Sequence, residues 1–214
     1  MISKDAFSDA SLDALRERVQ GMMSDKRFVH TAAVERMAVR LGELYCPEWI
    51  PQLRAAALLH DITKEETLEK QLQLCKTFEI TLEPTAKLAP KTLHARTAAS
   101  LIPVEFPAYA TETVVHAVRW HTTGCQSMTL ADKLVYLADY IDDSRKFPEC
   151  VRLRDYFWNA GPENMDMEAR LAHLRDTLIL SFDMTIRNLL AESVPISADT
   201  VLARNELIAQ REEK

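Results

Sequence analysis

Apolar residues recur at intervals of three and four along most of the chain, whereas strict alternation of apolar and polar residues is hard to find. The segment SLDALRERVQGM places Leu12, Leu15 and Val19 on one face, and a second segment that begins near Asp25 repeats the pattern. This spacing is typical of amphipathic α-helices rather than strands. The pattern therefore predicts an all-α protein.

Further segments follow from the same spacing and from the positions of the prolines. Pro51 suits the first turn of a third helix, whereas Pro103 and Pro107 are expected to close the helix that precedes them. A loop is expected at 79–91, where two prolines occur. The segments after the third helix are TLEKQLQLCKTF (67–78), TLHARTAASLI (92–102), AYATETVVHAVRWHT (108–122), TLADKLVYLADYIDD (129–143), VRLRDYFWNAG (151–161), a long helix at about 166–192 and a weakly helical tail, 197–214.

Two helix starts carry the spacing of a capping box, in which a threonine caps the helix and an acidic residue three positions later reaches back. Thr63 and Glu66 have this spacing, so the third helix is expected to end near residues 61–62 and the next to begin at once. Thr129 and Asp132 have box-like spacing at the start of a later helix.

The length of 214 residues is usual for one domain. We expect three parts of a single bundle: an N-terminal helix within 1–24, a core at 25–150 and C-terminal helices at 151–214 that complete it. The apolar edge of the long helix could pack inside this bundle or against a second copy, so a homodimer is left open.

Composition and charge exclude several classes of partner. Hydrophobic residues make up 47% and charged residues 27%, a globular balance. No apolar run approaches the roughly 20 residues of a membrane span, and the first residues do not read as a signal peptide, so we expect a cytoplasmic protein with no membrane partner. A formal net charge of −6 argues against nucleic acid as a partner. The chain has four cysteines without CxxC spacing, and no glycine-rich phosphate loop.

Four of the six histidines lie on the apolar faces of predicted helices. His30 has apolar residues four, seven and eleven positions after it, and His60 and His121 each have apolar residues three and seven positions before them. His94 is placed similarly on its short helix. His116 lies about 140° from His121 around one helix, so it is not expected to join them.

Two aspartates accompany these histidines. Asp61 directly follows His60, and Asp139 lies at the edge of an apolar stripe. A carboxylate is costly to bury alone, but a divalent cation that binds imidazole and carboxylate together neutralises such a cluster. The cluster therefore suggests a metal site, although any one histidine alone is more often a hydrogen-bonded core residue.

The order H…HD…D, formed by His30, His60 with Asp61, and Asp139, resembles the HD-domain phosphohydrolases. The closer similarity is to their YqeK-type branch, the symmetrical bis(5'-nucleosyl)-tetraphosphatases of bacteria. The segments that carry it are KRFVHTAAV (26–34), AALLHDITKE (56–65), LHARTAA (93–99), AVRWHTTG (117–124) and LADKLVYLADYIDDSRKFP (130–148). Family members usually have a Glu-Pro pair before the arginine, where this chain reads DYIDDSR.

This resemblance implies a single HD-domain helical bundle with a buried mono- or dinuclear metal site. The metal would be iron, with manganese or another divalent ion as the alternative. The implied ligands of one metal are His30, His60, Asp61 and Asp139, and those of a second are Asp61 as a bridge, His94 and His121. The implied reaction is symmetrical hydrolysis of diadenosine tetraphosphate to two ADP by a metal-activated water.

Groups beside these ligands are expected to act on the phosphates. Asp61, Lys64 and Arg145 are the expected catalytic residues, because a bridging carboxylate and two cations suit phosphoryl transfer. The expected substrate contacts are Arg27, Lys64, Thr122, Thr123, Gly124 and Arg145.

Three other functions remain open. The first is an HD-type nucleotidase or triphosphohydrolase that acts on mononucleotides. The second is a catalytically silent nucleotide-binding regulator. The third is a helical interaction domain whose histidines are only core residues, which would bind no metal.

Overall fold

The computed structural model describes residues 4–212, so residues 1–3 and 213–214 of the expected first and last parts lie outside it. Across this range the chain forms ten α-helices, short 3₁₀ turns and no strand, which confirms the all-α prediction. The helices are α1 (Asp9–Gln20), α2 (Asp25–Tyr45), α3 (Ile50–Leu59), α4 (Leu68–Thr77), α5 (Leu93–Glu105), α6 (Glu112–Trp120), α7 (Leu130–Ile141), α8 (Pro148–Asn159), α9 (Met167–Ala191) and α10 (Ala198–Glu212).

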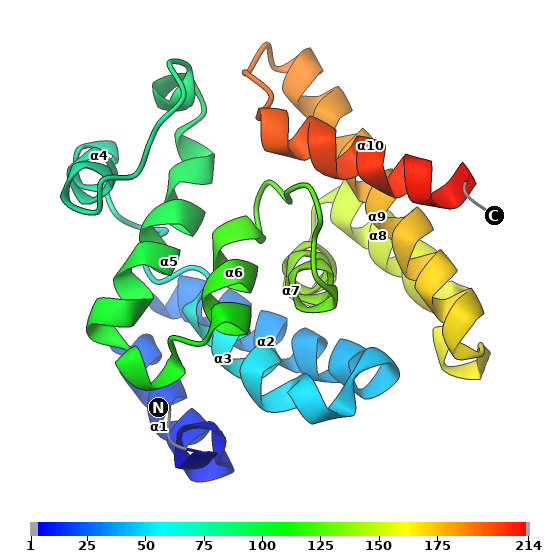
Figure 1. The fold of residues 1–214 in the computed structure, drawn as a ribbon, viewed down its shortest axis with the longest axis horizontal. Helices are drawn as coiled ribbons and strands as arrows, with labels where there is room; N and C mark the ends of the chain where they lie inside the picture. Colours follow the sequence, from blue (N-terminus) through cyan, green and yellow to red (C-terminus); the bar gives the residue numbers. More distant parts are fainter. Residues whose placement is uncertain (1–3, 213–214) are drawn as a thin grey trace.

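Helices α2, α3, α6 and α7 form the centre of the fold (Figure 1). α2 packs against α3 and α7, and α6 packs against α3, α5 and α7. α4 and α5 lie on one side of this centre, and α8, α9 and α10 lie together on the other (Figure 1). This arrangement brings the ends of α3 and α6 beside the middle of the bundle.

The core is built from the apolar faces of these helices. Leu12, Leu15 and Val19 of α1 are buried, and Phe106, Phe157 and Phe182 are among the largest fully buried side chains. None of the helices from residue 4 to residue 212 has the length and apolar character needed to cross a membrane.

The junction between α3 and α4 differs from the prediction. α3 ends at Leu59, and α4 has Thr67 as its N-cap, whose hydroxyl accepts a hydrogen bond from the Lys70 N–H. Thr63 is buried instead and donates a hydrogen bond of 3.0 Å to the carbonyl of His94 on α5. The predicted capping box at Thr63 was wrong because a tertiary contact uses this hydroxyl.

Two other helix ends were also predicted. Both hydrogen bonds of a capping box join Thr129 and Asp132 at the start of α7, which confirms that start. Pro103, by contrast, lies inside α5, which continues to Glu105. A proline removes one helical hydrogen bond, but Ile102 directly before it and Phe106, the C-cap residue of α5, are both buried.

Candidate functional site

Six histidine and aspartate side chains meet at the centre of the fold. They are His30 (α2), His60 and Asp61 (directly after α3), His94 (α5), His121 (directly after α6) and Asp139 (α7). Nε2 of His30 lies 2.9 Å from Oδ1 of Asp139, and Nε2 of His94 lies 3.1 Å from Oδ1 of Asp61. The structure thus brings together every histidine and aspartate expected to bind a metal.

Helix ends orient two of the imidazoles. His60 and His121 are the C-cap residues of α3 and α6. Nδ1 of His60 lies 2.6 Å from the carbonyl oxygen of Ala57, and Nδ1 of His121 lies 2.7 Å from that of Val118. Because a carbonyl only accepts, each Nδ1 carries a proton, and each Nε2 is the ring nitrogen that faces Asp61 in the cluster. Metal-ligating histidines have this arrangement.

Protonation states in the cluster follow from burial and from neighbouring charges. Burial lowers the pKa of His121 and lowers that of His94 to about 3, so both rings are neutral near pH 7. Burial alone would raise the pKa of Asp61, but the neighbouring imidazoles of His60, His121 and His94 hold it well below its usual value. Neutral imidazole beside ionised carboxylate is the donor set that divalent metals take.

The arrangement of these donors fits a divalent metal. Ligand atoms of His30, His60 and Asp139 lie within 4.8 Å of one another, and so do those of His60, Asp61 and His121. Nε2 of His60 is buried and has no hydrogen-bond partner among residues 4–212. An unpartnered buried polar atom is costly, and a bound cation would satisfy it. The residues therefore fit one divalent ion, or two ions with a shared ligand.

Two arginines contact the carboxylates of the cluster. Nη1 of Arg27 lies 2.8 Å from Oδ2 of Asp61, and Nη2 of Arg145 lies 2.5 Å from Oδ1 of Asp139. Both side chains are partly exposed, since 27% and 28% of their side-chain surfaces are accessible. The two arginines that were expected to contact the substrate therefore extend from the buried cluster to the solvent-accessible surface.

Lys64 and Thr122 contact the same histidine from different segments. Nζ of Lys64 lies 3.2 Å from Nε2 of His94, and Oγ1 of Thr122 lies 3.2 Å from the same atom. Burial lowers the pKa of Lys64, whereas the carboxylates of Asp61 and Asp139 act in the opposite direction. Although α3 ends before Lys64, this residue still reaches the cluster.

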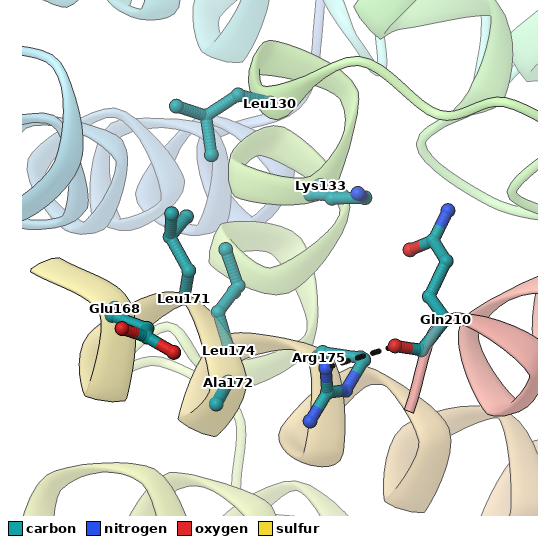
Figure 2. Close-up of a pocket in the computed structure, with 8 residues that line it drawn as sticks. All are labelled: Leu130, Lys133, Glu168, Leu171, Ala172, Leu174, Arg175 and Gln210. Atoms are coloured by element: carbon teal, nitrogen blue, oxygen red, sulfur yellow. Dashed lines mark hydrogen bonds between the residues drawn. The ribbon is translucent and has the colours of Figure 1, made fainter. Parts of the chain in front are cut away.

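A cleft of about 680 Å³ opens beside the cluster and is lined in part by Arg27, His30 and Arg145. A second cavity, of about 380 Å³, lies between α7, α9 and α10 (Figure 2). Figure 2 shows its leucines gathered on one side and Arg175 beside the backbone of Gln210. None of the clustered residues lines this second cavity. The first cleft is therefore the candidate substrate site.

Comparison with known proteins now identifies the family. The model of the HD domain family matches residues 27–143, more than half of the chain. The chain belongs to the HD domain family. The matched region contains all six residues of the cluster.

Three curated relatives of this HD-domain protein bear the name symmetrical bis(5'-nucleosyl)-tetraphosphatase. The Bacillus subtilis protein is 29% identical over 89% of this chain and 94% of its own length. The Halalkalibacterium halodurans protein is 28% identical over 90% and 95%, and the Staphylococcus aureus protein 28% over 71% and 76%. The expected enzyme class, an HD-type hydrolase, is that of all three relatives.

A solved HD-domain structure has the same fold. It is a predicted HD superfamily hydrolase involved in NAD metabolism from Clostridium acetobutylicum, with a TM-score of 0.79 and 29% identity. The match covers 92% of this chain and 97% of that one. The predicted HD-domain helical bundle is thereby confirmed.

Asp142 is a residue of the HD-domain site that the sequence pattern did not identify. It is fully buried, and its Oδ2 lies 3.3 Å from Nδ1 of His30. Its Oδ1 accepts a hydrogen bond of 2.8 Å from the N–H of Ser144. Burial alone would lower the pKa of His30, but hydrogen bonds to Asp139 and Asp142 raise it to about 9. The available sequence signal was the segment DYIDDSR, which places the carboxylate of Asp142 three residues after Asp139.

Two predicted substrate contacts have other positions. Thr123 is buried, its hydroxyl donates to the carbonyl of Gly124, and its own carbonyl accepts from Thr200 of α10. Gly124 has a φ of +64°, and a Cβ there would lie 2.6 Å from Phe182. Both residues therefore join the turn after α6 to the C-terminal helices and do not support a substrate contact.

His116 is separate from the cluster, as predicted. It forms a third group with Cys125 and Asp132 whose ligand atoms lie close together. Nδ1 of His116 lies 2.8 Å from Oδ2 of Asp132, and its Nε2 accepts from the indole of Trp120. Burial raises the pKa of the Cys125 thiol to about 12, so it stays protonated. We therefore interpret this group as residues that cap and pack helices.

Proposed function

We propose that this HD-domain protein is a metal-dependent phosphohydrolase that cleaves diadenosine tetraphosphate symmetrically into two ADP. The observation that carries the proposal is the meeting of four imidazoles and two carboxylates beside an open, cation-lined cleft. The names of the three curated relatives support the choice of substrate.

The clustered residues could hold one or two divalent ions, for which we propose iron, with manganese as an alternative. When bound, the metal would supply Lewis-acid chemistry, which acidifies water and polarises a phosphoryl oxygen. Asp61 lies between the two groups of ligand atoms, within 3.7 Å of Nε2 of both His30 and His121. This position suits a carboxylate shared between two ions.

The cations of the cluster suit the binding of a polyphosphate. Arg27 and Arg145 approach it from α2 and from the loop after α7, and Lys64 approaches from the segment after α3. In phosphoryl transfer, negative charge spreads over the phosphoryl oxygens, and fixed cations lower the energy of that state. Thr122 offers a hydroxyl beside Lys64, and we keep it as a substrate contact.

The products identify the reaction. Purified protein loaded with Fe²⁺ or Mn²⁺ is expected to convert diadenosine tetraphosphate to ADP alone, as measured by ion-exchange chromatography. Formation of ATP plus AMP would contradict symmetrical cleavage. A panel of ATP, GTP and NAD tests the mononucleotide alternative and the NAD metabolism named for the structural neighbour. If any of these compounds is turned over faster than diadenosine tetraphosphate, that compound replaces it as the proposed substrate.

A further inference from the structure

Two large apolar side chains are exposed in the cleft beside the cluster. Phe147 is 67% exposed and Val29 is 61% exposed, and both line the cleft together with His30. A single exposed apolar residue is ordinary on a protein surface. Two of them in one cleft, next to a proposed phosphate-cleaving site, point to a ligand that has an apolar part.

The backbone presents the Phe147 ring in a defined place. Phe147 is the N-cap of α8, with φ −63° and ψ 138°, and Pro148 follows it at the first helical position. Proline restricts the preceding residue to this extended region. Two residues earlier, Arg145 is bound to Asp139. The backbone at Phe147 is therefore held on both sides, which lowers the entropy lost when a ligand packs on its ring.

The remainder of the cleft carries positive charge, although the chain has a net charge of −6. Its one lining carboxylate, Glu65, accepts hydrogen bonds of 2.8 and 2.6 Å from the N–H and hydroxyl of Ser24. Nζ of Lys146 donates to a backbone carbonyl, that of Asp143. The cations that line the cleft are Lys26, Arg27, Arg145 and Lys146.

We infer that this cleft binds one nucleoside diphosphate half of the substrate, with its nucleobase stacked on Phe147 and packed against Val29. Lys26 and Lys146 then bind phosphates on the nucleoside side of the scissile bond. The volume of about 680 Å³ is in the range of small-molecule sites, and aromatic stacking with cations beside it is how proteins hold bases next to phosphates. This inference rests on the proposed function, because it names the subsite for that substrate.

Stacking has a consequence for specificity. Every nucleobase has a π-face, so an aromatic platform accepts adenine and guanine alike. Among the lining residues, the carboxylate of Glu65 and the hydroxyl of Ser144 are already hydrogen-bonded, to Ser24 and to Asp142 respectively, and so are not free to read a base edge. The diguanosine analogue is therefore expected to have a KM within a few-fold of that of the diadenosine substrate.

The test compares Phe147→Ala, Phe147→Trp and Leu190→Ala in the metal-loaded protein. Leu190 is 64% exposed and lies on α9 outside the cleft, so it matches Phe147 in exposure. Phe147→Ala is expected to raise the KM for the dinucleotide on the order of ten-fold, with kcat within two-fold of the wild-type value. Phe147→Trp is expected to restore the wild-type KM. Leu190→Ala is expected to change neither KM nor kcat. The inhibition constant of ADP should rise with KM, whereas that of inorganic pyrophosphate, which has no base, should not.

Calorimetric binding of ADP separates this inference from the proposed function. If the wild-type protein binds ADP and Phe147→Ala weakens that binding without any turnover of dinucleotide, the base subsite stands and the proposed substrate fails. If turnover gives ADP but Phe147→Ala leaves KM and ADP binding unchanged, the subsite is overturned and the function stands. Circular dichroism checks that both Phe147 variants retain the helical content of the wild type.

Discussion

Asp142 acts on the cluster through His30 rather than by facing the other ligands. Its buried carboxylate lies behind the imidazole, on the side away from Asp139 and Asp61. Carboxylates in this position fix the tautomer and the orientation of a metal-ligating histidine, and their loss typically costs about 10- to 100-fold in metal affinity. We therefore propose that Asp142 is a positioning residue.

The first prediction concerns this residue. Asp142→Ala is expected to weaken Mn²⁺ binding by about ten-fold or more, as measured by metal titration of the apoprotein, and excess metal should restore much of the activity. Asp142→Glu should bind metal more tightly than Asp142→Ala, because it retains the carboxylate. Asp143→Ala is the matched control, since the Asp143 side chain is 64% exposed. Equal affinities for Asp142→Ala and the wild type would show that Asp142 does not support His30.

At the residue scale, helical periodicity identified the four histidines and Asp139, and Asp61 followed from its position directly after His60. His30, His94 and Asp139 lie within helices, where the direction of a side chain follows from its sequence position. Asp142 follows the last residue of α7, where the period of the helix no longer applies. Gly124 was assigned to the substrate site as the residue that eases the turn after His121, but in the structure this turn places it against Phe182.

At the element scale, the same short motif had two outcomes. Thr129 is exposed at the start of α7, and its hydroxyl accepts the hydrogen bond from the Asp132 N–H that completes a capping box. Thr63 has the same spacing to an acidic residue, but it is buried against α5, and its hydroxyl donates to His94. A local pattern predicts a helix start only where tertiary contacts leave the capping group available.

The turn between α6 and α7 is joined to α9 through Gly124. A Cβ on this residue would lie 2.6 Å from Cζ of Phe182, a fully buried ring, and its φ of +64° disfavours any side chain. We expect Gly124→Ala to lower the free energy of unfolding by about 2–4 kcal/mol, because overpacking adds to backbone strain. Chemical denaturation measures this loss.

Gly161→Ala separates the two contributions to this loss. Gly161 also has a positive φ, +67°, but a Cβ there meets only the side chain of Asn164 at 3.3 Å. Its substitution should cost about 1 kcal/mol from backbone strain alone. Equal losses for the two glycines would show that the overlap of an added Cβ with Phe182 contributes nothing to the loss at Gly124.

At the scale of the whole molecule, the cluster joins segments that are far apart in the sequence. Its six residues belong to α2, α5 and α7 or follow α3 and α6, so a metal bound there would link five segments of the folded chain. The unfolded chain holds these ligands at no fixed distance. Metal should therefore bind the folded state preferentially and stabilise it by mass action.

Removal of metal tests this link without measuring activity. At a metal concentration about 100-fold above Kd, stabilisation is about 2.7 kcal/mol, which for a chain of this size corresponds to about 5–10 °C in Tm. We expect dialysis against a chelator to lower Tm by this amount and added Mn²⁺ to restore it, as measured by differential scanning calorimetry.

Asp61→Ala is the control that separates the cluster from other cation sites. Asp61 contacts His60, His94 and Arg27 within 3.4 Å. Its loss should therefore remove most of the metal-dependent rise in Tm, and elemental analysis should show that the bound metal is lost too. Far-ultraviolet circular dichroism should still show a helical protein. If the metal instead bound to the group of His116, Cys125 and Asp132, His116→Ala would abolish the rise in Tm and Asp61→Ala would not. A protein with no metal-dependent Tm and less than about one equivalent of metal, at full helical content, would instead be the helical interaction domain that the sequence left open.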